Sequence, residues 1–167
     1  MNVLGAIVQR SASIAPLRWI LRLAVRVLAP RHYVGAVGAV VNDEGKVLVA
    51  KHAYRTDFPW GLPGGWVNAG ESPADAVRRE IAEELKLDVT IERLLLCDVI
   101  PSVARSIAPR HLGVAFLCRL AGGEIRMSGE IVGVDWIDPA ANPYELAHFQ
   151  ASAVAAAARA IRPSGKT

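Results

Sequence analysis

The apolar positions between residues 17 and 28 follow a helical period. In this segment, LRWILRLAVRVL, arginine recurs at every fourth position and apolar residues fill all the others. That spacing predicts an amphipathic helix with a narrow cationic stripe and a wide apolar arc. Pro30 then ends the helix. An apolar arc of this width packs on the rest of the chain or on a second subunit, or it lies on a membrane surface.

From about His32 onwards, short β-rich apolar runs are separated by turn residues, and two later segments have helical spacing. Strands and helices do not alternate regularly, so the pattern predicts a mixed α/β layered fold and not a doubly wound sheet. The expected elements are a hairpin of residues 33–42 and 46–52, a helix from Pro73 (capped by Ser72) to about Leu85, strands at 89–100, 111–120 and 132–138, a turn at Ala121-Gly122-Gly123, and a helix from about Pro143 to Ile161.

The length and composition are those of one folded domain with an added arm. The chain has 167 residues, of which 52% are hydrophobic and 21% charged, which is enough apolar material for a core and excludes disorder. We expect an arm at residues 1–31, a main domain at 32–162 and a flexible tail at 163–167. Two cysteines are too few for a disulfide scaffold. Both Cys97 and Cys118 lie in apolar runs, and we expect reduced core thiols in a cytoplasmic protein.

The basic charge is concentrated in the arm. The formal net charge is +3, but residues 1–33 hold five arginines and no acid, so the remaining residues carry 3 − 5 = −2. Nucleic acid is therefore not expected as a partner, because binding its backbone requires many clustered cations. No uncharged apolar run has the length of a transmembrane helix, and the start of the chain lacks a signal-peptide layout. The helix at 17–28 is the candidate surface for a peripheral membrane contact or a homodimer.

Three carboxylates on the helix after residue 72 are the first candidate for chemistry. Glu80, Glu83 and Glu84 stand at positions i, i+3 and i+4 and share one helix face. Glutamate clusters on helices are usually solvated, but the preceding Gly64-Gly65 offers a backbone that can approach a ligand closely. Carboxylates grouped beside such a loop suit a phosphate site bridged by Mg²⁺ or Mn²⁺.

These residues also resemble a known family motif, the Nudix box. Gly65 is followed after five residues by Glu71 and after seven more by Arg79-Glu80-Ile81-Ala82-Glu83-Glu84, with Leu87 beyond. One position departs from the pattern, because Lys86 stands where the family has glycine. The resemblance covers about residues 33–160 and implies an α/β/α sandwich around a mixed sheet. It also implies Mg²⁺-dependent hydrolysis of a nucleoside diphosphate linked to another moiety, with Mn²⁺ as a substitute metal.

The resemblance assigns a role to each matching residue. Side chains of Glu80, Glu83 and Glu84, with the Gly64 carbonyl, would bind the metal. Arg79 would pair with Glu71 or a ligand glutamate and hold the carboxylates in place. The general base is Glu83 or Glu84, or a downstream acid, for which Glu130 is the best candidate because it precedes the strand at 132–138.

Substrate contacts are expected from the segment before the box and from the box itself. The candidates are Lys51 and Arg55 for phosphate, an aromatic ring for a base, and backbone approach at the first box glycine; the residues are Lys51, Arg55, Phe58, Trp60 and Gly65. His52 is expected to be a satisfied imidazole at a strand end. A nucleoside diphosphate sugar or an ADP-ribose-type molecule is the preferred substrate, and a nucleoside triphosphate or dinucleotide is the alternative. A catalytically silent, nucleotide-binding regulatory domain is the alternative of another class.

Lys86 leaves two conformations open. The family's glycine marks a helix end that often requires a left-handed residue, and lysine would be strained there. Alternatively, the helix continues for one more residue and no strain exists.

Overall fold

The computed structural model describes residues 15–29, 32–101 and 110–161. The chain divides into two compact units, Met1–His32 and Tyr33–Thr167, and each is treated by itself. The expected boundaries of arm, domain and tail stay a prediction, and the tail at 163–167 lies outside the described residues. The first unit contains one described helix, α2 (Ala15–Leu28), where the sequence predicted a helix at 17–28.

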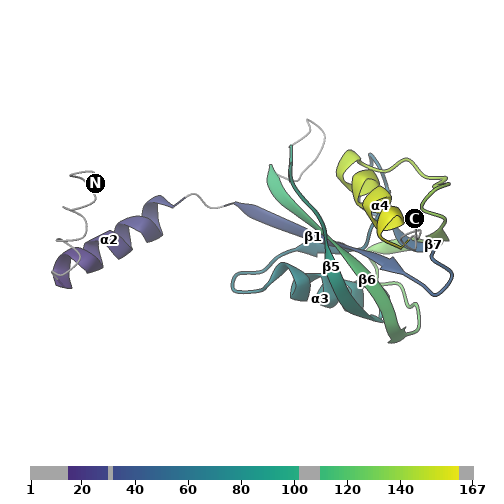
Figure 1. Cartoon of the computed structure of the whole chain (residues 1–167), viewed down its shortest axis with the longest axis horizontal. Helices are drawn as coiled ribbons and strands as arrows, with labels where there is room; N and C mark the ends of the chain where they lie inside the picture. Colours follow the sequence, from purple (N-terminus) through teal and green to yellow (C-terminus); the bar gives the residue numbers. More distant parts are fainter. Residues whose placement is uncertain (1–14, 30–31, 102–109, 162–167) are drawn as a thin grey trace, which may run out of the picture. The chain divides into compact units, whose positions relative to one another are not determined.

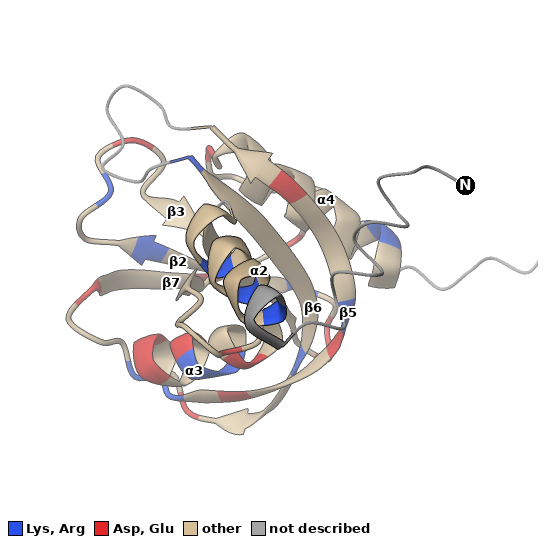
Figure 2. Ribbon diagram, turned by 90° about the vertical axis from the view of Figure 1, so that its left-hand side faces the viewer, with Lys and Arg blue, Asp and Glu red and all other residues tan. Residues whose placement is uncertain are grey.

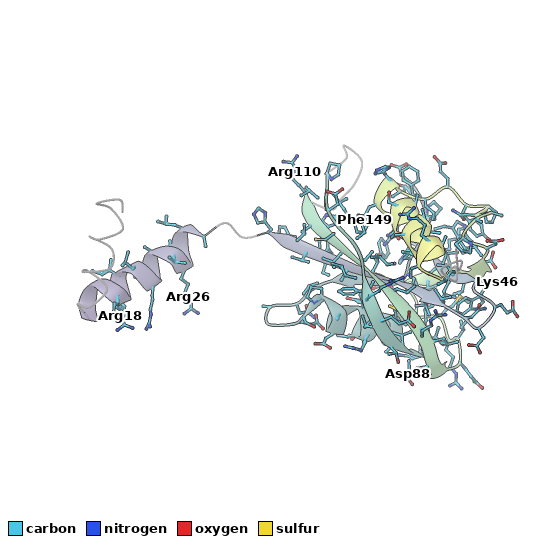
Figure 3. The ribbon with its side chains drawn as sticks, in the orientation of Figure 1. Arg18, Arg26, Lys46, Asp88, Arg110 and Phe149 are labelled. Carbon is cyan, nitrogen blue, oxygen red and sulfur yellow. The ribbon has the colours of Figure 1, made fainter. Side chains whose placement is uncertain are left out.

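The apolar side chains of α2 are exposed. Trp19 is 66% exposed and Leu28 is 78% exposed. Arg18 and Arg26 project from the same side of the helix, as expected for one cationic stripe (Figure 3). Among the residues described, no helix combines the length and the hydrophobicity needed to cross a membrane.

The described strands of the second unit form one mixed sheet (Figure 1). Along the sheet the order is β3-β2-β1-β6-β5, with β4 also paired to β1 and β7 to β2. β1 and β6 run parallel from Tyr33 opposite His111 to Val41 opposite Arg119, and the other pairs are antiparallel. The strands are β1 (Tyr33–Val41), β2 (Val47–His52), β3 (Trp60–Gly61), β4 (Gly64–Trp66), β5 (Leu87–Ile100), β6 (His111–Gly123) and β7 (Ile131–Ile137).

Two helices cover the two faces of this sheet, so the expected α/β/α sandwich is confirmed. One core contains Phe149 and Ala153 of α4 (His148–Ile161), and the other contains Val77 and Ile81 of α3 (Pro73–Leu85). Alternate residues of β1 and β2 enter each core, which explains why both strands are continuously apolar. A Cβ at Gly38 of β1 would lie 2.8 Å from side chains of α3, so glycine allows the helix to approach.

The predicted hairpin is present, but its two strands soon part. β1 and β2 pair at Val41 and Val47, whereas β1 nearer its start pairs with β4, Val37 opposite Gly64. β2 pairs instead with β7 and β3. This divergence lets β4 enter beside β1, and β4 delivers the box glycines to the side of the sheet covered by α3.

Two expected boundaries are wrong. Ala121-Gly122-Gly123 is not a turn, because β6 continues through Gly123, which lies opposite Leu87 of β5. The last helix begins at His148 and not near Pro143. Before it, the Asn142 side chain accepts a hydrogen bond from the Tyr144 N–H at 3.0 Å, and this local bond competes with helix formation.

The two cysteines differ in environment. Cys118 is buried, as expected, but Cys97 is exposed. β5 lies at the end of the strand order, where much of its length faces solvent, so the expectation of a core thiol at Cys97 is wrong.

Candidate functional site

The residues at both ends of α3 fix the helix that carries the glutamates. At its start, the Ser72 hydroxyl accepts a hydrogen bond from the Asp75 N–H at 3.1 Å, and Pro73 occupies the first turn, as predicted. At its end, Lys86 adopts φ +59°, and its N–H donates to the Ala82 carbonyl. Of the two conformations left open for Lys86, the left-handed one is therefore present.

Gly64 and Gly65 bring β4 closer to its neighbours than any side chain would allow. Gly64 has φ +144°, and a Cβ there would collide with the Ala36 carbonyl oxygen of β1. At Gly65 a Cβ would lie 2.5 Å from the carboxyl carbon of Glu80. The space left by the missing side chain is thus occupied by the Glu80 carboxylate, which explains a glycine at this box position.

Glu84 is a buried carboxylate, 5% exposed. Its Oε2 accepts a hydrogen bond from the Gly64 N–H at 3.1 Å. Burial raises the pKa of Glu84 to about 7; the Gly64 hydrogen bond and Arg55 oppose this shift, and the charges of Glu80 and Glu130 add to it. Within the described part of the chain, no lysine or arginine forms an ion pair with Glu84.

Arg79 holds the exposed side of the cluster. It binds both oxygens of Glu71, at 2.8 and 3.0 Å, and this pairing lowers the pKa of Glu71 to about 2. The same guanidinium donates to Glu80 at 2.8 Å, to Glu83 at 3.3 Å and to the Trp66 carbonyl at 3.0 Å. The expected pairing of Arg79 with Glu71 and with ligand glutamates is therefore present. Figure 2 shows the acidic and basic positions side by side on α3.

The three glutamates share a helix face but do not point to a common centre. Glu80 and Glu83 turn to Arg79, and Glu84 turns to Gly64. Accordingly, residues 15–29, 32–101 and 110–161 contain no three His, Cys, Asp or Glu side chains grouped as metal ligands. The chemistry of the donors nevertheless fits Mg²⁺ or Mn²⁺, because all are carboxylates and the buried one has no cationic partner.

The loop before β7 brings Glu130 to this end of α3. The Ser128 N–H donates to the Glu84 carbonyl at 2.8 Å, and the Glu130 carbonyl accepts from the Ala53 N–H at 2.9 Å. The charge of Glu130 contributes to the raised pKa of Glu84. Its proximity agrees with the expected downstream acid, and its catalytic role stays a prediction.

The expected phosphate-binding cations lie around the β2–β3 end of the sheet. The Arg55 Nη1 approaches Gly61 so closely that a Cβ there would be 2.8 Å away. Lys51 pairs with Trp60 of β3 and with Gly133 of β7. Both cations therefore border the segment that leads into the glycine loop.

The two expected aromatic contacts have different surroundings. The Trp60 ring stacks on Tyr144 at 4.0 Å between centroids, so one of its faces is already covered. The Tyr144 hydroxyl in turn donates to Asp135 at 2.7 Å, which fixes the pair. Phe58 is 40% exposed and has φ +51°, a strained conformation for a bulky residue. Phe58 has the freer ring, and substrate binding by either residue stays a prediction.

His52 is the residue at the site that sequence reasoning misjudged. It stands at a strand end, as expected, but neither of its ring nitrogens has a hydrogen-bond partner among the described residues. Its Nδ1 lies 3.8 Å from Oε1 of Glu84. Alternation along β2 could have predicted the burial of His52 beside α3. Leu48 and Ala50 face α3, and His52 is the next residue in that alternation.

Comparison with known proteins identifies the family of the chain. The family model described as NUDIX domain matches residues 32–157. A "MutT-like protein" of Streptomyces ambofaciens is 33% identical over 110 residues, which span 66% of either chain. A "Putative 8-oxo-dGTP diphosphatase" of Bacillus subtilis is 32% identical over 111 residues, 65% of this chain and 68% of that protein.

A solved structure of an ADP-ribose pyrophosphatase from Streptococcus suis superposes with a TM-score of 0.63 at 25% identity, covering 82% of this chain and 97% of that one. The family model spans the sheet, α3, the first part of α4 and the glutamate cluster beside Gly64 and Gly65. The chain therefore belongs to the Nudix family and is a Nudix hydrolase.

Proposed function

We propose that this hydrolase uses Mg²⁺ to cleave the diphosphate of a nucleoside diphosphate linked to another moiety. The observation that carries the proposal is Glu84, a buried carboxylate that shares a helix face with Glu80 and Glu83 and lacks a cationic partner in the described chain. Ionised Glu84 is costly to bury, and a divalent cation would remove that cost.

The metal would be held by Glu80, Glu83, Glu84 and the Gly64 carbonyl. Bound there, it supplies charge neutralisation of the diphosphate and a water of lowered pKa. Glu80 and Glu83 accept hydrogen bonds from Arg79. To bind the cation, each would have to give up part of its contact with Arg79. Mn²⁺ is expected to replace Mg²⁺ because it prefers similar oxygen ligands.

The chain's own residues then prepare the substrate and the attacking water. Arg79, anchored on Glu71, keeps the carboxylates near their bound positions. We assign the base that takes a proton from the attacking water to Glu83 or Glu84, or to Glu130 from the neighbouring loop. Arg55 is the nearest candidate to hold a phosphate oxygen, because its charge already acts on Glu84.

The preferred substrate is an NDP-sugar or a molecule of the ADP-ribose type, in line with the structural similarity to an ADP-ribose pyrophosphatase. A nucleoside triphosphate is the second candidate, in line with the similarity to the 8-oxo-dGTP diphosphatase relative. Lys51, Arg55, Phe58 and Trp60 are the residues expected to distinguish them, with Gly65 admitting the phosphates.

A substrate panel separates these candidates. Purified protein with Mg²⁺ is offered ADP-ribose, NDP-sugars, dinucleotides and nucleoside triphosphates, and the nucleotide products are resolved by chromatography. We expect release of a nucleoside monophosphate from an NDP-linked substrate with the highest kcat/KM. A higher kcat/KM for triphosphates would select the alternative, and binding without turnover across the panel would contradict the enzymatic assignment.

We also propose that α2 attaches the enzyme to an anionic membrane surface. The first 33 residues of the chain contain no acid to pair with its stripe of arginines, and within the described part of the first unit its apolar side chains, from Trp19 to Leu28, are mostly exposed. Arginines of this kind match lipid phosphates, while Trp and Leu enter the interface. The 14 residues of α2 are suited to lying in the interface.

The membrane proposal is tested with vesicles of phosphatidylcholine alone and with added phosphatidylglycerol. We expect sedimentation of the full chain with anionic vesicles only, together with a blue shift of Trp fluorescence. Replacing Arg18, Arg22 and Arg26 by Gln should abolish binding, whereas replacing Arg78 and Arg93, which lie outside the helix, should not. Self-association without vesicle binding would show that a second copy covers the helix instead.

A further inference from the structure

His52 is a buried side chain that the proposed mechanism leaves without a role. It is 1% exposed, and among the described residues neither Nδ1 nor Nε2 finds a hydrogen-bond partner. Burying polar atoms without partners is destabilising, and an apolar residue of similar volume would avoid that cost. The choice of histidine therefore requires a reason other than packing.

The backbone around His52 directs its side chain at Glu84. The His52 N–H donates to the Pro59 carbonyl at 2.8 Å, and His52 continues the alternation by which Leu48 and Ala50 of β2 face α3. Nδ1 lies 3.8 Å from Oε1 of Glu84, while Oε2 accepts the Gly64 N–H.

The approach of the two side chains suits a hydrogen bond from the imidazole to the carboxylate. A histidine ring can carry a hydrogen on either nitrogen, and of the two it is Nδ1 that lies near Glu84. Placing that hydrogen on Nδ1 aims the donor at the carboxylate, the arrangement commonly used to orient metal ligands.

We propose that His52 is a positioning residue that orients the carboxylate of Glu84 for metal binding. Its Nδ1–H would donate to Oε1 once the carboxylate moves about 0.8 Å closer, the difference between 3.8 Å and a normal hydrogen bond. The Gly64 N–H of β4 holds Oε2, and His52 of β2 would hold Oε1. The plane of the Glu84 carboxylate would then be fixed by groups on two strands. This inference rests on the proposed function, since only a ligand-binding carboxylate needs a fixed plane.

The test is Mn²⁺ affinity of the full chain, measured by electron paramagnetic resonance without substrate. We expect His52→Leu to weaken Mn²⁺ binding about tenfold or more, the usual effect of losing such a partner. His52→Asn, whose amide can donate from near the Nδ1 position, should stay within about threefold of the wild type. The control Val49→Ala lies on the same strand but in the other core, and should lower stability without changing Mn²⁺ affinity.

A double substitution shows whether His52 acts through Glu84. In the Glu84→Gln background, adding His52→Leu should cause no further loss of Mn²⁺ affinity. Wild-type affinity in His52→Leu, or a full additional loss in the double variant, would overturn the inference. His52→Phe serves as the second apolar variant if His52→Leu does not fold. A wild-type chain that binds no Mn²⁺, or a Glu84→Gln variant that binds it normally, would instead overturn the proposed metal site.

Discussion

At the residue scale, the acids of the box occupy two unlike environments. Glu71 and Glu80 are compensated by Arg79, while Glu84 is buried against a backbone N–H and the His52 imidazole. The sequence could predict the shared face of the glutamates, because helix spacing determines it. It could not predict which acid is buried, because that depends on β4 and β2, which approach from elsewhere in the chain.

Arg79→Lys should lower kcat about tenfold or more. Lysine lacks the planar fork that binds both oxygens of Glu71 while reaching Glu80, so the carboxylates lose their orientation. The neighbouring Arg78→Lys is the control, because Arg78 pairs with exposed Asp75. The kcat of each variant is measured by steady-state kinetics at saturating Mg²⁺. Equal kcat values for the two variants would contradict the role of Arg79.

Glu84→Gln should stabilise the protein at pH 8 in the absence of divalent metal. The folded-state pKa of about 7 lies above the ordinary glutamate pKa of 4.5, so ionised Glu84 opposes folding. This cost is absent below pH 4.5 and complete above pH 7, on the order of 3 kcal/mol.

Urea unfolding of both proteins at pH 5 and pH 8 measures that difference. The advantage of Glu84→Gln should be large at pH 8, small at pH 5, and reduced when Mg²⁺ is added to both. An advantage that does not depend on pH would show that the ionised carboxylate is not the source of the cost.

At the scale of elements, backbone conformations place the site. β4 reaches α3 because Gly64 and Gly65 lack side chains, and α3 ends at Lys86 in the left-handed region. The sequence predicted the hairpin, the capped helix and its end, since all three depend on local residue chemistry. The prediction of a turn at 121–123 is wrong because Gly123 pairs with Leu87. This long-range contact outweighs the local preference of glycines for turns.

Lys86→Gly should raise the free energy of unfolding by about 0.5–1 kcal/mol, because glycine adopts φ +59° without strain. Lys86→Ala is the matched control: it removes the charge but keeps the Cβ, and should not stabilise. Urea denaturation measures both. Mg²⁺-dependent kcat should stay within about twofold, since Lys86 is left-handed at the helix end, beyond the last glutamate. A less stable Lys86→Gly variant would contradict this account.

At the scale of the whole molecule, charge separates the two units. The first 33 residues hold five arginines and no acid, while the rest of the chain has a net charge of −2. The family match begins at residue 32 and covers the sheet and the glutamates, so we expect the hydrolase chemistry not to require the arm. Sequence alone could predict this division, but not which surface covers α2.

Deleting residues 1–31 should leave kcat/KM for a small soluble substrate within a few-fold of the full chain. The same deletion should abolish binding to anionic vesicles. Comparing hydrolysis with vesicle sedimentation separates the two effects. A truncated protein that cannot fold would show that the arm belongs to the core of the domain.

In the proposed mechanism, the box glutamates hold a divalent cation that drives diphosphate hydrolysis. Glu84→Gln probes this metal site, because the substitution preserves the shape of the side chain and removes its charge. With the preferred substrate at saturating Mg²⁺, we predict that kcat falls at least ~10²-fold, about 2.7 kcal/mol of barrier, while the protein stays folded. Turnover equal to that of the wild type in this folded variant would contradict the account.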